Sequence, residues 1–448
     1  MKPFKLFWLV LYFIIPLIPI GLIFSSPVGG STDPVYLISV VSGACAFVWL
    51  VNQLVISARP KFIEKNYGMD RMYRFHSWMA VVCVGLLIVH RQTKLAWMGF
   101  VPTIAQIAAI LFILAVLFAV IFLANTRLRK LKFVQNMVRF ADQKLGLGFN
   151  RVVLFHNLTV VASVLMVLHV STTGAADLSF PVRLFYWIYF GLGAGFYLAH
   201  KVVRPWIQSR GAYRVEEVIE ELPTIRTLRL RPPGNKPLFT YKPGQFAFIK
   251  PLGGDVIREE HPFTISSSPV NREAITFTIK ALGDFTASLE LMEPGIPVRV
   301  DAPYGVFSYQ QRAPGEPMGM IAGGIGITPI LSMLRTLRKT EPKRQVTFLW
   351  AVNQAEELFC KEELDAAAAE MPNFTWHPVV AFDESWPGEK GFVDKDKLGR
   401  LLLDGADDAN TSMDIYLCGP PVMMDLVTGH LKDLGVPAGR ILSERFSF

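Results

Sequence analysis

Six long apolar runs occupy the first 205 residues of the chain. A hydrocarbon core about 30 Å thick needs roughly 20 apolar residues in a helix. A cleavable signal peptide is the alternative for the first run, which follows Lys2 and Lys5, but its length and the further runs favour a retained helix. The pattern predicts membrane-spanning helices over residues 4–24, 36–57, 75–95, 102–124, 152–172 and 181–203.

After residue 208 the pattern changes to shorter elements. Segments such as RTLRLRP, FAFIKP and AITFTIKAL are typical of short strands between turns, and they predict a small antiparallel β-barrel over 208–312. From 313 to 448 strand-like and helix-like segments alternate, which predicts a doubly wound parallel α/β domain. The expected fold class is therefore an α-helical membrane bundle of six spans over 1–207, followed by a β-barrel and an α/β domain.

The basic residues refine this picture. The formal net charge of +8 is compatible with nucleic-acid binding, but Lys and Arg cluster in alternate loops between the apolar runs, with five in residues 58–74 and seven in 125–151. Such alternation reflects membrane topology. We therefore expect an integral membrane protein with both termini in the cytoplasm, a lipid bilayer as its partner, and no nucleic acid. The four cysteines lack CxxC spacing, which argues against a disulfide framework or a zinc site.

Two of the predicted spans carry paired histidines. His76 and His90 are 14 residues apart, and His156 and His169 are 13 apart, which correspond to rises of about 21 and 19.5 Å. Hydrogen bonding within the bundle is the alternative, but ionisable groups at membrane depth are costly and usually functional. Ligands so far apart cannot share one metal ion. One imidazole from each span could instead ligate each of two stacked b-type haems, an arrangement suited to electron transfer.

The spacing of 13 residues has a geometric consequence. It leaves His169 about 140° around an ideal helix from His156. The fifth span therefore needs a bend, a bulge or different ring angles if both histidines are to serve as ligands.

Glycine-rich turns in the α/β half predict a nucleotide site. GGIGITP (323–329) joins a strand to a helix, where glycines admit a phosphate to unpaired backbone N–H groups. CGPPVMM (418–424) repeats this strand-to-helix arrangement near the end of the chain. A tight turn without a ligand is the alternative for GGIGITP.

Three features predict a flavin site. In HPFTISSSP (261–269), Thr264 and the local backbone could bond the edge of the flavin ring, and His261 could meet a phosphate or the isoalloxazine. A solvent-facing polar strand is the alternative. The turn Gly283–Thr286 opens a helix suited to an anionic diphosphate. The terminal aromatic Phe448 could serve as a planar lid on the flavin, although packing is the usual role of such a residue.

Together these motifs resemble known protein families. PGQFAFIK, HPFTISSSP, DAPYG, GGIGITPILSML, YLCGPPVMM and Phe448 resemble the ferredoxin–NADP reductase-like module. RPKFIEKNYGMDRMYRFH with the histidine pairs resembles the ferric-reductase-like transmembrane domain. In this order the two are similar to the NADPH oxidase and ferric reductase superfamily, and most to its bacterial NADPH oxidase homologues.

The resemblance implies roles for individual residues. It places His76 with His156 on an inner haem and His90 with His169 on an outer one. The FAD contacts it implies are His261, Pro262, Phe263 and Thr264, with Gly283 and Thr286 near the diphosphate and Phe448 over the ring. The NADPH or NADH site would be lined by Gly323, Gly324, Gly326, Thr328, Cys418, Gly419 and Pro420. Asn353 and Gln354 stand where NADPH-specific members have an arginine, which puts strict NADPH preference in doubt.

The expected function is electron transfer from cytosolic NAD(P)H through FAD and two haems to dioxygen, which yields superoxide on the far side. Phe448, Cys418 and Arg91 are the candidate catalytic residues, and Arg91, next to His90, could favour the superoxide anion or simply mark the membrane interface. A ferric chelate or a quinone is the alternative acceptor. A haem-less membrane-anchored reductase and a transporter with histidine relays are rival functions. We expect no obligatory protein partner.

Overall fold

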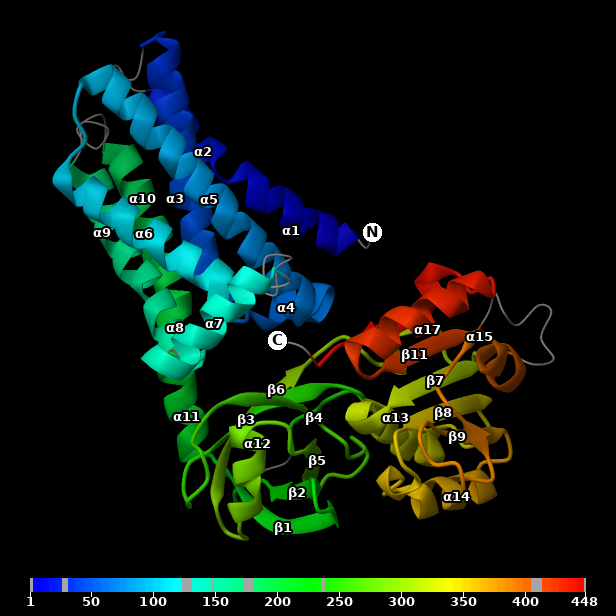
Figure 1. The fold of residues 1–448 in the computed structure, drawn as a ribbon. Coiled ribbons are helices and arrows are strands. Elements are labelled where there is room, and N and C mark those ends of the chain that lie inside the picture. The colour runs from blue at the N-terminus through cyan, green and yellow to red at the C-terminus, as the bar shows by residue number, and fades with distance from the viewer. Residues whose placement is uncertain are drawn as a thin grey trace. The chain divides into compact units, whose positions relative to one another are not determined.

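The computed structural model describes residues 3–25, 31–122, 131–146, 149–172, 180–234, 238–403 and 413–446. The chain divides into two compact units, Met1–Arg204 and Pro205–Ser447 (Figure 1). This boundary falls three residues before the one predicted from the sequence. We describe each unit separately.

Helices make up the described part of the first unit. They are α1 (Pro3–Ile14), α2 (Leu17–Phe24), α3 (Pro34–Ser57), α4 (Lys61–Tyr67), α5 (Met69–Met98), α6 (Thr103–Phe122), α7 (Lys132–Leu145), α8 (Phe149–His156), α9 (Leu158–Thr172), α10 (Phe180–Leu198), the π-turn η2 (Ala199–Val203) and α11 (Arg204–Arg210), which continues into the second unit. Among the described residues, six helical segments are long and apolar enough to cross a membrane. Each coincides with one of the six predicted spans.

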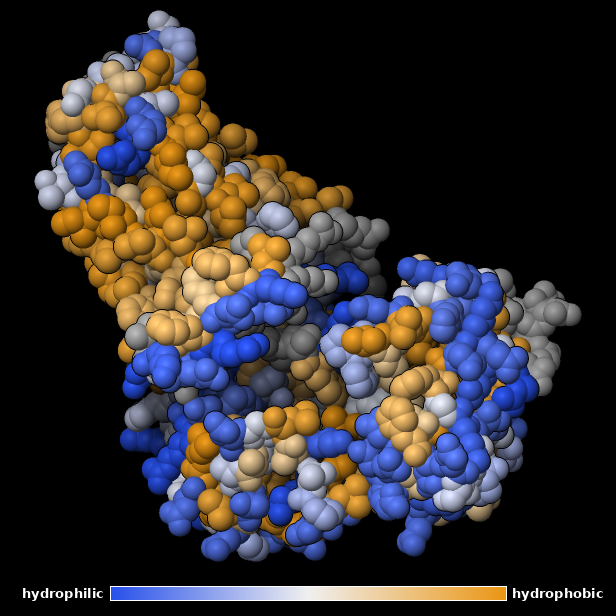
Figure 2. Space-filling view, viewed as in Figure 1, coloured by the Kyte–Doolittle hydropathy of each residue, from blue (hydrophilic) through white to orange (hydrophobic). Residues whose placement is uncertain are grey.

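The surface of this unit exposes many large apolar side chains along its long helices. Large apolar side chains face outward along the helices, with Trp78 exposed by 72%, Leu114 by 60% and Leu192 by 60%. Figure 2 shows the hydrophobic colour gathered over these helices. A helix that is apolar on every side needs an apolar surrounding. Inside the bundle, Phe47 and Val182 are among the side chains that form the core.

The fifth predicted span is interrupted directly after a histidine. Helix α8 ends at His156 and α9 begins at Leu158. The Asn157 N–H donates to the carbonyls of Val153 (3.0 Å) and Leu154 (3.1 Å), which is a tightened last turn. The 13-residue spacing predicted an irregularity in this span, and the structure has one between His156 and His169.

A six-stranded antiparallel sheet forms the first part of the second unit. Its strands are β1 (Tyr213–Leu222), β2 (Ile225–Arg231), β3 (Phe246–Pro251), β4 (His261–Thr264), β5 (Ile275–Lys280) and β6 (Pro297–Tyr304), in the order β4-β3-β6-β1-β2-β5. Beyond β4, the Ser266 N–H donates to the Thr276 carbonyl at 2.9 Å, which ties the two edges of the sheet together. Leu228, Ile249 and Phe277 are buried in its core. The predicted antiparallel barrel is confirmed.

A six-stranded parallel sheet follows. Its elements are β7 (Met318–Gly323), α13 (Ile327–Thr340), β8 (Val346–Val352), α14 (Lys361–Glu370), β9 (Phe374–Val380), β10 (Glu389–Lys390), α15 (Lys395–Lys397), β11 (Asp414–Cys418), α17 (Pro421–Asp433) and β12 (Ile441–Glu444). The strand order is β10-β9-β8-β7-β11-β12, which confirms the predicted doubly wound domain. The order reverses between β7 and β11, and ligands of such sheets bind beyond the carboxyl ends of the strands at this point.

Candidate functional site

The two glycine-rich turns meet at the point where the strand order reverses. A Cβ atom on Gly326 would lie 2.4 Å from the Cys418 carbonyl oxygen, and one on Gly323 would lie 2.8 Å from Pro420 Cδ. Gly324 has φ +51°, in the left-handed region that favours glycine. The turn after β7 and the turn after β11 therefore form one backbone-lined site, and only glycine permits their close approach.

Other predicted residues of this site are turned inward. Thr328 is buried, and its hydroxyl donates to the Ile325 carbonyl at 3.2 Å. Cys418 is completely buried in the core, and burial raises the pKa of its thiol well above the usual value. The thiol is therefore neutral, and the predicted catalytic role of Cys418 stays a prediction. Gly419 is buried, whereas Pro420 is exposed at the start of α17. Direct contacts of Thr328 and Cys418 with a nucleotide stay predictions.

The predicted flavin segments lie next to each other in the barrel. The His261 ring stacks on the Phe285 ring, with centroids 4.2 Å apart, and Phe263 stacks on the same ring at 6.1 Å. Phe285 belongs to α12 (Asp284–Ser288), so this stack joins β4 to the Gly283–Thr286 turn. Nε2 of His261 is 3.0 Å from a carboxylate oxygen of Glu259. The imidazole thus has a carboxylate partner, which the sequence did not predict.

The turn before α12 offers fewer free donors than the sequence suggested. The Thr286 hydroxyl accepts from the N–H groups of Leu282 (2.8 Å) and Gly283 (3.0 Å) and donates to the Gly283 carbonyl (2.9 Å). These bonds close the cap of the short helix. A diphosphate contact at this turn would have to compete with the cap, because the hydroxyl and both N–H groups are already engaged. Pro262 and Thr264 pair with β3 in the sheet, opposite Phe248 and Phe246.

Two histidines from different spans face one another. The rings of His76 on α5 and His156 at the end of α8 have centroids 6.2 Å apart and planes 82° apart. Nδ1 of each ring is buried and has no hydrogen-bond partner among the described residues. Buried polar atoms are normally paired, so packing alone gives no reason for these two.

His90 is held by the neighbouring helix. Its Nδ1 lies 2.8 Å from the Ser39 carbonyl oxygen on α3, so Nδ1–H donates to that oxygen. A Cβ atom on Gly43 would lie 2.6 Å from the same nitrogen, so α3 needs glycine there. On α9, Nδ1 of His169 is buried without a partner among the described residues. Among all the residues that the structure describes, no three or more His, Cys, Asp or Glu side chains are grouped so that they could hold a metal ion.

A cavity lies on the side of α5 that faces α6. It has a volume of about 240 Å³ between α5 and α6. Its lining includes Arg91, next to His90 in the sequence, together with Gln92 and Gln106, while apolar side chains form the rest. The predicted catalytic residue Arg91 therefore reaches a space large enough for a small molecule. Phe448, the predicted flavin lid, lies outside the described residues.

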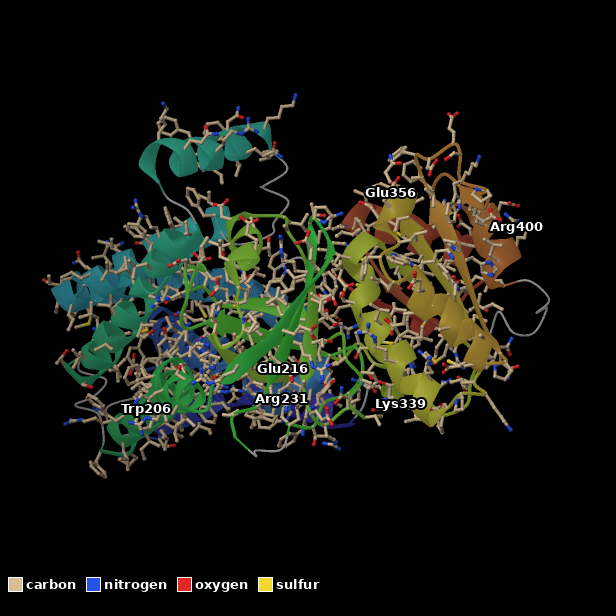
Figure 3. All side chains as sticks on the ribbon, turned by 90° about the horizontal axis from the view of Figure 1, so that it is seen from below. Trp206, Glu216, Arg231, Lys339, Glu356 and Arg400 are labelled. Carbon is tan, nitrogen blue, oxygen red and sulfur yellow. The ribbon has the colours of Figure 1, made fainter. Side chains whose placement is uncertain are left out.

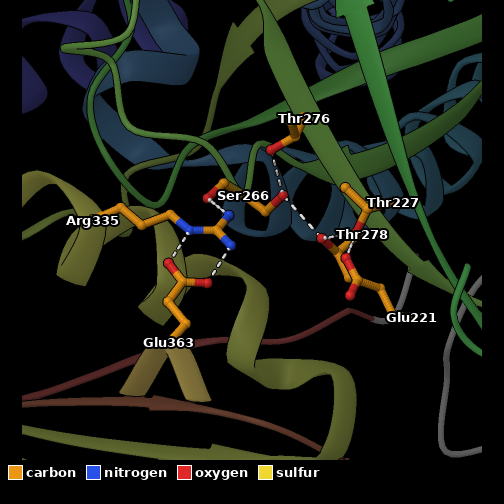
Figure 4. Close-up of polar contacts among 7 residues, drawn as sticks. All are labelled: Glu221, Thr227, Ser266, Thr276, Thr278, Arg335 and Glu363. Atoms are coloured by element: carbon orange, nitrogen blue, oxygen red, sulfur yellow. Dashed lines mark hydrogen bonds and ion pairs between the residues drawn. The ribbon is translucent and has the colours of Figure 1, made fainter. Parts of the chain in front are cut away.

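A polar cluster that the sequence analysis missed joins the barrel to the α/β domain. Arg335 of α13 binds both carboxylate oxygens of Glu363 at 2.7 and 2.6 Å, and donates to the Ser266 carbonyl at 2.8 Å (Figure 4). The Ser332 hydroxyl donates to the Ser267 carbonyl at 2.7 Å. These bonds end on backbone carbonyls, which every residue has, so the serine side chains of HPFTISSSP gave no specific signal of this interface.

Comparisons with known proteins agree with this architecture. Residues 222–308 match a family described as an FAD-binding domain, and residues 320–429 match the oxidoreductase NAD-binding domain. The chain is 33% identical to one component of the Na(+)-translocating NADH-quinone reductase of Neisseria meningitidis over 168 residues, or 37% of this chain and 40% of the relative. It is 30% identical to a flavohemoprotein of Deinococcus radiodurans over 240 residues, or 52% of this chain and 58% of the relative.

The chain thus spans about half the length of these curated relatives. Among solved structures, the FAD/NAD-binding domain of a nitric oxide dioxygenase from Vibrio cholerae is 27% identical, with a TM-score of 0.47, and the match covers 52% of this chain and 98% of that one. The second unit of this chain is an oxidoreductase module that contains an FAD-binding domain and an NAD-binding domain.

Proposed function

We propose that this chain is a transmembrane oxidoreductase that carries electrons from cytosolic NAD(P)H, through FAD and two haems b, to dioxygen on the far side of the membrane. Superoxide is the product. Six membrane-length helices and the two oxidoreductase domains support this proposal. The basic loops support an orientation with both termini in the cytoplasm, and the location we propose is a bacterial inner membrane.

The observation that carries the proposal is the separation of the His76 and His156 rings. Two histidines that held one metal ion would each place a ring nitrogen about 2.0–2.1 Å from it, so their rings would have to lie close together. The centres of the His76 and His156 rings are 6.2 Å apart. Ring packing alone also gives such distances, but it leaves the two buried Nδ1 atoms unexplained.

The outer pair is supported by a different contact. Metal-bound histidines commonly donate their second ring N–H to a carbonyl, which fixes the tautomer. His90 makes this bond to Ser39 through Nδ1, which leaves Nε2 as the ligand. His169 would supply the opposite ligand. The interruption at Asn157 supports the pairing of both histidines of this span with partners on α5.

The bound groups would supply the electron chemistry: FAD converts a two-electron hydride into single electrons, and haem carries these one at a time. The chain provides the binding. The glycine turns after β7 and β11 would admit a dinucleotide to the backbone, and the stack of His261 and Phe263 on Phe285 would shape one wall of the barrel site. The histidines of the spans would hold the iron.

A ferric chelate is a second candidate acceptor. The cavity that Arg91 lines measures about 240 Å³, which is far more than dioxygen needs. A guanidinium at this position would attract an anionic chelate as well as favour superoxide. The same chain would then act as a ferric reductase.

The test is cytochrome c reduction by purified, FAD-supplemented protein in air, with and without superoxide dismutase. Strong inhibition by the dismutase would support oxygen reduction to superoxide. Weak inhibition, together with fast reduction of a ferric chelate, would favour the second candidate. Replacement of His90 by Leu should remove one haem of the two, and an unchanged haem-to-protein ratio would refute its role as a ligand.

A further inference from the structure

An acidic and aromatic rim lies at the carboxyl ends of β8 and β9, which we call the β8 edge. Its residues are Asn353, Gln354, Glu356 and Glu357 after β8, and Phe382, Asp383 and Glu384 after β9. Strand β8 pairs directly with β7, which leads into the glycine turn. In doubly wound nucleotide domains, the adenosine ribose of a dinucleotide lies at the end of this neighbouring strand. Figure 3 labels Glu356 on the α/β domain.

Hydrogen bonds fix the shape of the β8 edge. One carboxylate oxygen of Glu357 accepts from the Asn353 N–H at 2.9 Å, and the other is 3.2 Å from Lys280 Nζ on the barrel. The Asn353 carbonyl accepts from the Phe382 N–H at 2.9 Å. The loops after β8 and β9 are therefore held together, and Lys280, a cation on the barrel, is already neutralised by a carboxylate.

Glu356 differs from Glu357 in its surroundings. Its side chain is exposed, and no hydrogen bond or ion pair of Glu356 is recorded within the described part of the chain. Two exposed aromatic rings lie on the neighbouring segment, Phe382 (61% exposed) and Phe392 (68%), with centroids 5.6 Å apart. An available carboxylate near exposed aromatic faces fits an adenosine, whose ribose hydroxyls donate hydrogen bonds and whose base stacks.

The charges of the β8 edge oppose the 2′-phosphate that distinguishes NADPH from NADH. Residues 351–357 and 381–390 contain five carboxylates, one lysine and no arginine. The cations Lys280 and Arg400, which lie outside these segments, each pair with one of the carboxylates, Glu357 and Glu389. The lysine, Lys390, donates to the Glu384 carbonyl and keeps its charge. Negative charge is therefore in excess at this rim, and a 2′-phosphate would add about two more negative charges to it.

We infer that the β8 edge selects NADH against NADPH, with Glu356 accepting hydrogen bonds from the adenosine ribose and repelling a 2′-phosphate. This inference rests on the proposed function, in which a nicotinamide dinucleotide is the electron donor. Like charges brought together at a binding site discriminate strongly. We expect kcat/KM to be at least about tenfold higher with NADH than with NADPH, chiefly through KM, because the 2′-phosphate is remote from the hydride.

The experiment measures flavin-dependent reduction of ferricyanide by the purified, FAD-loaded full-length protein, with NADH and NADPH as donors. Ferricyanide takes electrons from reduced flavin, so this readout does not depend on the haems or on dioxygen. The variant Glu356→Arg supplies the missing cation and should lower the NADH-to-NADPH ratio at least about tenfold. Glu217→Arg, which makes the same charge change at an exposed site on β1, is the matched control and should leave the ratio unchanged.

The outcomes separate the two proposals. A wild-type preference for NADPH, or a ratio that Glu356→Arg leaves unchanged, would overturn the inference while the proposed electron donor stands. If neither nucleotide reduces the bound flavin, the proposed function fails and the inference fails with it. The inference is supported if the wild type prefers NADH, Glu356→Arg lowers the NADH-to-NADPH ratio, and Glu217→Arg leaves that ratio unchanged.

Discussion

Replacement of Arg335 by Ala should loosen the barrel from the α/β domain. The guanidinium makes three short bonds, two to Glu363 and one to the Ser266 carbonyl. Burial lowers the pKa of Arg335, but the hydrogen bonds and charge of Glu363 outweigh this, so the pKa is raised above the usual value. The variant would leave the Glu363 carboxylate and the Ser266 carbonyl without this partner.

The magnitude follows from the exposure of the pair. Removing one partner of a fully buried ion pair costs about 3–5 kcal/mol. The side chains of Arg335 and Glu363 are each 30% exposed, so water can partly replace the lost partner. We therefore expect a loss of about 2–3 kcal/mol, which corresponds to a fall in Tm of roughly 4–12 °C for a unit of this size.

The assay is thermal release of FAD from the full-length protein, followed by flavin fluorescence. Arg338→Ala is the matched control, because Arg338 lies one turn later on α13 and binds both oxygens of Glu370 at the surface. Exposed pairs contribute about 0.2–1 kcal/mol, so its Tm should change little. Equal shifts for the two variants would refute the reasoning, as would additive effects of Arg335→Ala and Glu363→Ala in a double-mutant cycle.

Three further predictions follow from close contacts and burial. Gly43→Ala should displace the His90 ring and lower the haem-to-protein ratio, while Gly85→Ala, whose added Cβ would meet no atom within 4 Å, should retain both haems. Gly326→Ala should push the Cys418 carbonyl away and raise KM for the nucleotide more than tenfold, as steady-state kinetics would show. The Cys418 thiol should resist iodoacetamide at neutral pH until the protein is denatured, because it is buried and its pKa is raised; mass spectrometry of the native protein would reveal any early alkylation.

The sequence predicted the elements of this fold well because their signals are local. A bilayer-length apolar run and a strand with Pro/Gly turns can each be recognised within about 20 residues. The family resemblance also implied that the two glycine turns line one nucleotide site. Their contact through Gly326 and the Cys418 carbonyl needs the reversal of strand order, which only the folded sheet provides.

Contacts between distant segments were the part that sequence reasoning missed. Arg335 and Ser266 are 69 residues apart, and neither has a neighbour in the sequence that reveals the partner. The same holds for the pair of Lys280 and Glu357, 77 residues apart, which neutralises a cation that could otherwise receive a 2′-phosphate. Donor preference therefore depends on tertiary structure as well as on the neutral residues after β8.

Hydrogen-bond satisfaction distinguishes Arg335 from the facing histidines of the membrane-length helices. Three N–H groups of the Arg335 guanidinium donate to Glu363 and to the Ser266 carbonyl, so these three donors are not available to a ligand. His76 and His156 differ from Arg335, because Nδ1 of each ring is buried and has no hydrogen-bond partner among the described residues. An unpaired buried polar atom lowers the free energy of unfolding. Two unpaired ring nitrogens at facing positions in membrane-length helices therefore favour a functional role over a stabilising one. The proposed binding of one haem iron by both histidines would give these facing positions a function and is compatible with the 6.2 Å separation of their rings.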